Sequence, residues 1–132
     1  MIRLSEHEVF AGILGKGINI EHFDHIGYLS GDGSGSYADC REYIISHADY
    51  CDSIAYSKAF GLTDTIKERW REEGIDFRIY IYLKNDKVIG GHIFKYKEIK
   101  ANSHLPSVGY EMEPTQQEIR ITKRILEYIT NS

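Results

Sequence analysis

The chain has 132 residues, with 16 basic and 20 acidic side chains that give a net charge of −4. This length predicts a single domain over residues 1–132 that buries its core without disulfides or metal ions. The mild acidity argues against nucleic-acid binding, which needs clustered Lys and Arg. No apolar run approaches the roughly 20 residues of a membrane helix and no signal-peptide pattern opens the chain, so we expect a cytoplasmic protein without a membrane segment.

The first predicted element is a short helix from Glu6 to Leu14. Ser5 and Glu8 have the spacing of a capping box, in which the two side chains satisfy free backbone N–H groups at the helix start. The inward-facing side chains would be Val9, Phe10, Ile13 and Leu14. A strand is then predicted from His25 to Leu29.

Residues 30–36 read SGDGSGS and predict a loop. The glycine spacing is not that of a dinucleotide-binding turn, and no Gly-Lys-Ser/Thr sequence follows, so the segment does not predict a nucleotide site. A flexible surface loop, an anion contact and a partner-binding loop all fit this composition.

A long helix is predicted from Tyr37 to Phe60, because apolar and small residues recur along it at helical spacing. Cys40 and Cys51 would then lie on one helix about 16 Å apart, which is too far for a disulfide. His47 and Cys51 form an i, i+4 pair, but two ligands do not make a metal site. We therefore expect structural thiols and no bound metal.

A second helix is predicted from Ile66 to Glu73, capped by Asp64 or Thr65, with Ile66 and Trp70 facing inward.

A β-hairpin follows, because apolar and polar residues alternate from Phe77 to Lys84 and Asn85-Asp86 can form a two-residue turn. The predicted facing pairs are Phe77 with Phe94, Ile79 with His92, Ile81 with Gly90 and Leu83 with Val88, and on the other face Tyr80 with Gly91 and Tyr82 with Ile89. In this register His92 is a hydrogen-bonded core residue. Both faces are then fairly apolar, so helices, a partner or both should cover them.

The last predicted elements are a short strand that begins at Val108 and a helix from Thr115 to Ile129, which Thr115 and Glu118 open as a capping box. Together the elements predict an α+β fold. Its sheet would have three to four mostly antiparallel strands, with helices packed mainly on one face.

No catalytic set can be assigned from the residue pattern. His22 and His25, next to Glu21 and Asp24, could bind a metal, relay a proton or form a solvated polar turn. Sequence separation does not test the geometry of a catalytic triad, so we assign no nucleophile.

Ten tyrosines accompany a single tryptophan. Tyrosine is enriched at recognition surfaces, and it also occurs at the edges of protein cores. Our leading hypothesis is a protein-binding module that acts without catalysis, such as an inhibitor, an immunity protein or an accessory protein of a phage or mobile element. Its contact surface would use Tyr80 and Tyr82, or the loop with Asp32, Ser34 and Tyr37. An apolar sheet face could also form a homodimer.

The last 60 or so residues resemble the first half of a GNAT-family acetyltransferase. The segment from Lys87 to Gly91 (KVIGG) is similar to the family's third strand, and the segment from Met112 to Pro114 (MEP) is similar to the end of its fourth. The following residues occupy the position of the family's acyl-CoA loop, with Arg120 and Thr122 in place of glycines.

This resemblance implies an alternative function, acetyl-CoA-dependent N-acetylation. The backbone near Met112 would hold the pantetheine arm, and Gln117, Arg120 and Thr122 would surround the pyrophosphate. Arg120 would replace the lost backbone contacts with charge-assisted hydrogen bonds. Acetyl-CoA is the cofactor only under this alternative, and the leading hypothesis requires no cofactor.

Overall fold

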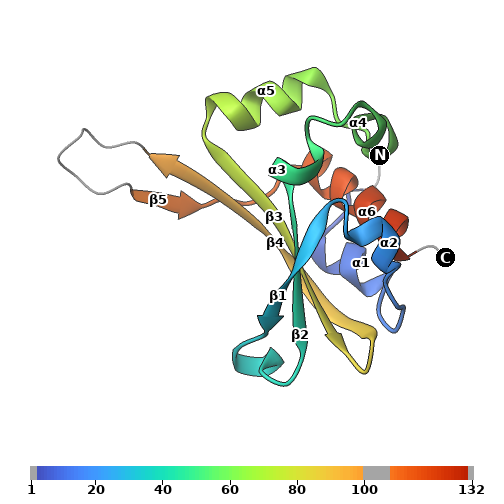
Figure 1. Cartoon of the computed structure of the whole chain (residues 1–132). Helices are drawn as coiled ribbons and strands as arrows, with labels where there is room; N and C mark the ends of the chain where they lie inside the picture. The colour runs from blue at the N-terminus through green and yellow to red at the C-terminus, as the bar shows by residue number, and fades with distance from the viewer. Residues whose placement is uncertain (1–2, 100–107, 131–132) are drawn as a thin grey trace.

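The computed structural model describes residues 3–99 and 108–130 and shows an α+β protein built on one antiparallel sheet (Figure 1). Five strands follow one another in the order β1-β2-β3-β4-β5. The predicted fold class is confirmed, although the sheet has five strands rather than the three to four predicted. The strands are β1 (Gly27–Asp32), β2 (Arg41–Ser46), β3 (Ile75–Lys84), β4 (Lys87–Ile99) and β5 (Val108–Glu111).

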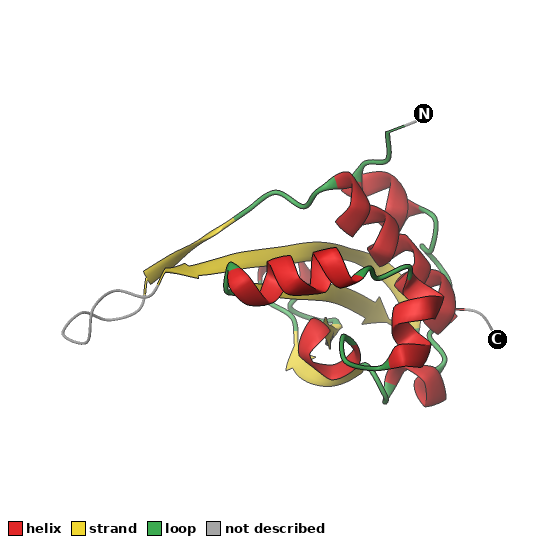
Figure 2. Ribbon diagram, turned by 90° about the horizontal axis from the view of Figure 1, so that it is seen from above, coloured by secondary structure: helices red, strands yellow, loops and turns green. Residues whose placement is uncertain are grey.

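The helices gather on one face of the sheet, as predicted (Figure 2). All six α-helices of the described part contribute side chains to a single core, which also takes in β2, β3 and β4. They are α1 (Glu6–Ala11), α2 (Ile20–Phe23), α3 (His47–Tyr50), α4 (Ile54–Phe60), α5 (Asp64–Glu72) and α6 (Gln116–Thr130), and a 3₁₀ turn, η1 (Gly35–Tyr37), joins β1 to β2.

Local capping signals place the helix starts. Ser5 accepts a hydrogen bond from the Glu8 N–H, so α1 begins as predicted, but it ends at Ala11, and Leu14 is exposed rather than inward. Thr115 and Glu118 form the predicted reciprocal capping box of α6. The cap of α5 is Thr63, one residue before the two that we predicted.

The predicted long helix from Tyr37 to Phe60 is wrong. Strand β2 occupies its first part, and two short helices, α3 and α4, occupy the rest. β2 lies between β1 and β3, where Ile44 and Ile45 are both buried although they point to opposite faces. A strand buried on both faces loses its apolar–polar alternation and cannot be told from a helix by periodicity.

The two cysteines consequently do not share a helix. Cys40 precedes β2 and is buried, and Cys51 follows α3 and is half-buried. Both are free thiols, as expected. Burial raises the pKa of the Cys51 thiol, which lowers its reactivity.

The hairpin of β3 and β4 has the predicted turn, with Asn85 and Asp86 both at positive φ. Leu83 pairs with Val88 as predicted, but Ile89 is then bulged out of the ladder, so the remaining pairs shift by one residue. Ile81 faces Gly91, and Tyr80 faces His92. His92 therefore lies on the face opposite to the one predicted, and it is not a core histidine.

A buried ion pair joins the sheet to the helices. Lys95 of β4 and Glu118 of α6 are 5% and 2% exposed, and the Lys95 Nζ lies 2.8 Å from the Glu118 Oε1. The Trp70 Nε1–H of α5 donates to the other carboxylate oxygen at 2.6 Å, and the Thr115 N–H donates to Oε1 at 2.8 Å. Each carboxylate oxygen thus has a donor, as a buried charge requires.

Replacing Glu118 by Gln should destabilise the fold strongly. The variant leaves the Lys95 ammonium buried without a counter-charge, so we expect the free energy of unfolding to fall by about 3–5 kcal/mol. Urea denaturation measures this loss as a lower midpoint. The control is Glu127→Gln, which breaks an exposed pair with Lys123 and should cost at most about 1 kcal/mol. Equal small losses for both variants would contradict the role of the buried pair.

Candidate binding surface on the open sheet face

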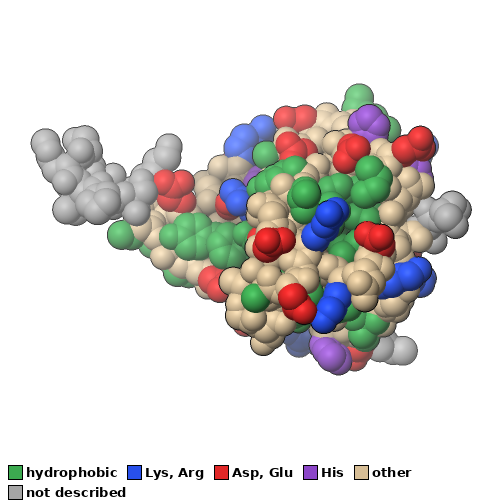
Figure 3. Space-filling view, turned by 60° about the horizontal axis from the view of Figure 1, so that its bottom comes forward, with side chains coloured by type: hydrophobic (Ala, Val, Ile, Leu, Met, Phe, Trp, Pro, Cys, Tyr) green, Lys and Arg blue, Asp and Glu red, His purple; other side chains and the backbone are tan. Residues whose placement is uncertain are grey.

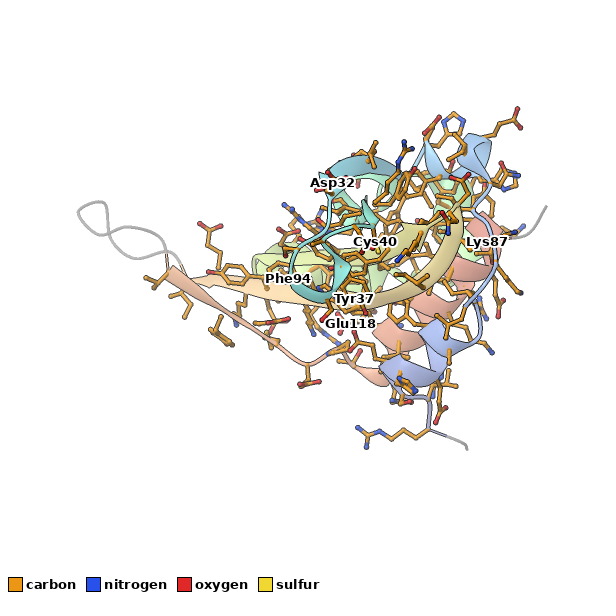
Figure 4. The ribbon with its side chains drawn as sticks, turned by 90° about the horizontal axis from the view of Figure 1, so that it is seen from below. Asp32, Tyr37, Cys40, Lys87, Phe94 and Glu118 are labelled. Carbon is orange, nitrogen blue, oxygen red and sulfur yellow. The ribbon has the colours of Figure 1, made fainter. Side chains whose placement is uncertain are left out.

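One face of the sheet points away from the helices, and we call it the open face (Figure 2). Hydrophobic and charged side chains lie side by side on the molecular surface seen from the lower side (Figure 3), and Figure 4 shows the side chains from below. The positions of the open face follow from the strand register, in which residues paired across strands share a face. None of these residues belongs to the core that the helices cover. The open face comprises Tyr28, Glu42, Ile44, Ser46, Asp76, Arg78, Tyr80, Tyr82, Gly90, His92, Phe94 and Tyr96.

A continuous row of six rings crosses this face, and we call it the aromatic ladder: Tyr37, Tyr82, His92, Tyr80, Phe94 and Tyr96. Tyr37 stacks on Tyr82 with ring centroids 4.0 Å apart, and Tyr80 stacks on His92 at 4.7 Å. Phe94 and Tyr96 stack at 5.7 Å. These contacts hold the rings in one arrangement before any partner binds, which lowers the entropy lost on binding.

Tyr37 comes from outside the strands. The 3₁₀ turn η1 between β1 and β2 places its side chain on the open face, where it stacks on Tyr82; Figure 4 labels Tyr37 on this connection. The contact needs a glycine beneath the ring, because a Cβ at Gly90 would lie 2.7 Å from the Tyr37 hydroxyl oxygen. The β1–β2 loop is thereby fastened to the β3–β4 hairpin.

Charged groups lie among the aromatic side chains. Arg78 forms an ion pair with Asp76 at 3.0 Å, and this hydrogen bond raises the pKa of the Arg78 guanidinium. Burial raises the pKa of Tyr82 to about 12, with a further contribution from the nearby Glu42 carboxylate.

The structure brings together three of the five partner-binding residues predicted from the sequence. Tyr37, Tyr80 and Tyr82 all belong to the aromatic ladder, so the hairpin and the loop, which were two alternatives, form one surface. Asp32 lies at the end of β1 opposite Arg41, and Ser34 precedes η1 without a capping hydrogen bond from its side chain. These two residues lie on the connection to the ladder rather than in it.

Sequence reasoning missed three rings of the ladder: His92, Phe94 and Tyr96. Their alternation along β4 was a readable signal, since residues two apart in a strand share a face. The predicted register lacked the bulge at Ile89 and so placed His92 and Phe94 toward the core.

The four residues that the acetyltransferase resemblance assigns to acetyl-CoA do not form one site. Thr122 is fully buried and its hydroxyl donates to the Glu118 carbonyl, so it cannot touch a ligand. Gln117 and Arg120 line one pocket of about 380 Å³. Met112 lines a different pocket of about 260 Å³.

The histidine and cysteine pairs considered as ligands serve other contacts. His22 stacks on Tyr128 at 4.5 Å, and the Nδ1 of His47 accepts a hydrogen bond from the Phe77 N–H at 3.1 Å. Within residues 3–99 and 108–130, no group of three His, Cys, Asp or Glu side chains is placed to hold a metal ion. The described helices also include none with the length and apolar character needed to cross a membrane.

Comparisons of the chain with protein-family models, with curated proteins and with solved structures found no match. What the fold and the surface define is therefore a structural class: an α+β sheet protein with helices on one face and an ordered aromatic surface on the other.

The raised pKa of Tyr82 predicts a late ionisation step. Tyrosinate absorbance should show one group titrating near pH 12, and the Tyr82→Phe variant should lack it, whereas Tyr50, whose pKa burial also raises, still ionises at higher pH. Between about pH 10 and about pH 12 the Tyr82 hydroxyl keeps its proton in the folded state but loses it in the unfolded state. The free energy of unfolding should therefore fall as the pH rises through this range. If the variant lost its tyrosinate absorbance near pH 10 and kept the step near pH 12, the assignment to Tyr82 would be wrong.

Proposed function

We propose that this chain is a small intracellular protein-binding module that acts by contact, without catalysis, through the aromatic ladder of its open face. The observation that carries the proposal is the row of six rings on the open face, in which each ring stacks on or packs edge-to-face against the next. Tyrosine and other aromatic residues are enriched in the energetically dominant centres of protein interfaces. An inhibitor, an immunity protein or an accessory protein of a phage or mobile element would act in this way.

Charge and ring geometry favour a protein partner over a nucleic acid. The net charge is −4, and the open face carries Glu42 and Asp76 beside Arg78, so the surface lacks the cationic groove that a phosphate backbone needs. Single-stranded nucleic acids also bind by stacking bases on free ring faces. In this ladder, stacked neighbours already occupy ring faces of Tyr37, Tyr82 and His92.

The polar groups of the ladder suit a protein surface as well. Tyr80 and His92 are half-buried, so each presents an edge to solvent while its stacked face is protected. A partner can pack apolar side chains against these edges and accept hydrogen bonds from the tyrosine hydroxyls. Homodimerisation through the same face is the self-association form of this proposal, and light scattering distinguishes it from binding to another protein.

Removing two rings of the ladder should abolish partner capture. Tyr37 and Tyr80 are half-buried, so the double variant Tyr37→Ala with Tyr80→Ala trims the contact surface without opening the core. We expect the wild-type chain to capture its partner from a lysate and the double variant to lose at least about tenfold in affinity, as for centrally placed aromatic residues.

The matched control is Tyr110→Ala. This tyrosine of β5 is 47% exposed and pairs with Lys97, whose position lies on the opposite face from Tyr96, so its loss leaves the ladder intact. Capture should be unchanged in the control. If the double variant, folded by circular dichroism, captured the same proteins as wild type, the open face would not be the contact surface.

A second candidate is the acetyl-CoA-dependent N-acetyltransferase that the resemblance implies. The observation in its favour is the pocket next to α6, where Gln117 and Arg120 are joined by Lys123 and Arg124. The lining also includes Glu127, which pairs with Lys123, so the positive charge available to an anionic ligand rests mainly on Arg124.

Millimolar acetyl-CoA tests this candidate by thermal unfolding. A ligand at about 100 times its dissociation constant adds about 2.7 kcal/mol, which would raise the midpoint by several degrees. The binding-module proposal predicts no shift. A clear shift that Arg124→Ala removes would instead support the acetyltransferase.

A further inference from the structure

A pocket of about 370 Å³ adjoins the aromatic ladder and is not part of the open face. α1 contributes Phe10 and Ala11 to its lining, Leu14 follows that helix, and Tyr37 and Ile89 also line the pocket. Gly90 and Gly91 line it without side chains. Leu14 and Ile89 are 51% and 39% exposed, so the pocket presents apolar surface to solvent beside the ladder. Tyr37 belongs to both surfaces and makes them continuous.

The pocket lies at the outer edge of β4, where that edge is free of backbone partners. On one side, Val88 exchanges hydrogen bonds with Gly15 and Lys16, and on the other, Lys95 accepts one from Met112. Along a strand, the backbone N–H and C=O of one residue point to one edge and those of the next residue point to the other edge. The N–H of Ile93 and the C=O of Lys95 point to the outer edge of β4, so both backbone groups of Gly91 point there too. No described residue forms a backbone hydrogen bond with them, because β5 ends at Glu111 and the segment at Gly15 and Lys16 reaches only Val88. The helix α1 lies beside this stretch and covers part of it, since Glu6 accepts a hydrogen bond from the Ile93 N–H.

Glu6 stands at the centre of this edge. One oxygen of its carboxylate accepts a hydrogen bond from the Ile93 N–H at 2.5 Å, and its side chain lines both this pocket and the adjacent pocket of about 260 Å³. Glu111 and Glu113 line that second pocket, and neither pocket has a lysine or arginine in its lining. The acidic second pocket therefore favours a cationic group, and the first pocket beside it favours an apolar one.

We propose that the β4 edge binds a short extended segment of the partner protein that carries a large apolar side chain and, two residues away, a lysine or arginine. The apolar side chain fills the pocket beside Tyr37, and the cation lies between Glu6, Glu111 and Glu113. The segment backbone pairs with Gly91, as in strand addition to a sheet edge. This inference rests on the proposed function, because it names the chemistry of the partner.

The spacing follows from strand geometry. The backbone N–H and C=O groups of Gly91 and Ile93 point to the outer edge of β4, and the two residues lie about 7 Å apart along the strand. Gly91 lines the first pocket and Ile93 lines the second. Alternate side chains of an added strand have the same separation, so one extended segment reaches both pockets.

The test uses two peptides, acetyl-Phe-Gly-Lys-amide and acetyl-Lys-Gly-Phe-amide, titrated into the isotope-labelled full chain and followed by amide chemical shifts. At least one should shift the Gly90, Gly91 and Ile93 amides saturably by about 10 mM, a concentration suited to a weak two-residue contact. Replacing lysine by glutamine in that peptide should weaken binding about threefold to fivefold, as for loss of a partly exposed ion pair.

The matched protein variants are Glu6→Gln and Glu8→Gln. The first keeps an oxygen acceptor for the Ile93 N–H and removes only the charge, so the fold is retained, and it should weaken the lysine peptide by the same factor. The second removes an equal charge from the exposed side of the same helix and should leave binding unchanged.

Three results would overturn the inference: no saturable shift at Gly91 with either peptide, equal binding of the glutamine peptide, or equal loss in both protein variants. The titration needs no natural partner, so it is independent of the capture experiment. Peptide binding with unimpaired capture by the single variant Tyr80→Ala, which leaves Tyr37 in the pocket, would remove the ladder as the contact surface and leave the edge site standing. If that variant lost partner capture and neither peptide bound, the ladder would stand as the contact surface and the edge site would be wrong.

Discussion

The buried contact among Lys95, Glu118 and Trp70 is the constraint on which the arrangement of the molecule depends. It joins β4, α6 and α5 at one point, and each carboxylate oxygen of Glu118 has a donor. A charge of this kind is tolerated inside a core only when its partners are held in place, so the contact specifies how these elements pack as well as stabilising them. The same carboxylate caps its own helix through the Thr115 N–H, which couples the start of α6 to the position of the sheet.

The core residues of all six described α-helices lie with the sheet face that carries Lys95, and no described α-helix contributes to the opposite face. The chain stabilises that face with its own aromatic side chains and with Tyr37 from the β1–β2 connection. The bulge at Ile89 decides which residues of β4 lie on the open face and which lie on the face that the helices cover. It turns Gly91 toward Phe10 in the core and sets Gly90 beneath Tyr37 on the open face.

The two surfaces proposed for binding share a physical origin. The ladder is the side of the sheet that the helices leave bare, and the edge site is the part of β4 between the loop at Gly15 and the end of β5. Tyr37 lines both, so a partner segment added at the edge would continue directly onto the ladder. A small contact at the edge and a larger aromatic contact on the face would then act as one interface, with the edge setting the direction of the partner chain.

The sequence by itself determined the local elements. The Ser5 and Thr115 caps, the Asn85-Asp86 turn and the periodicity of α6 depend on residues within a few positions of one another, and all are present in the fold. Tertiary structure alone decided that residues 41–46 form a strand, that Ile89 leaves the ladder and that Tyr37 stacks on Tyr82. These depend on contacts between distant segments, and a strand covered on both faces has no alternation to reveal it. The tyrosines of the candidate site were therefore visible in the sequence, but their union into one surface was not.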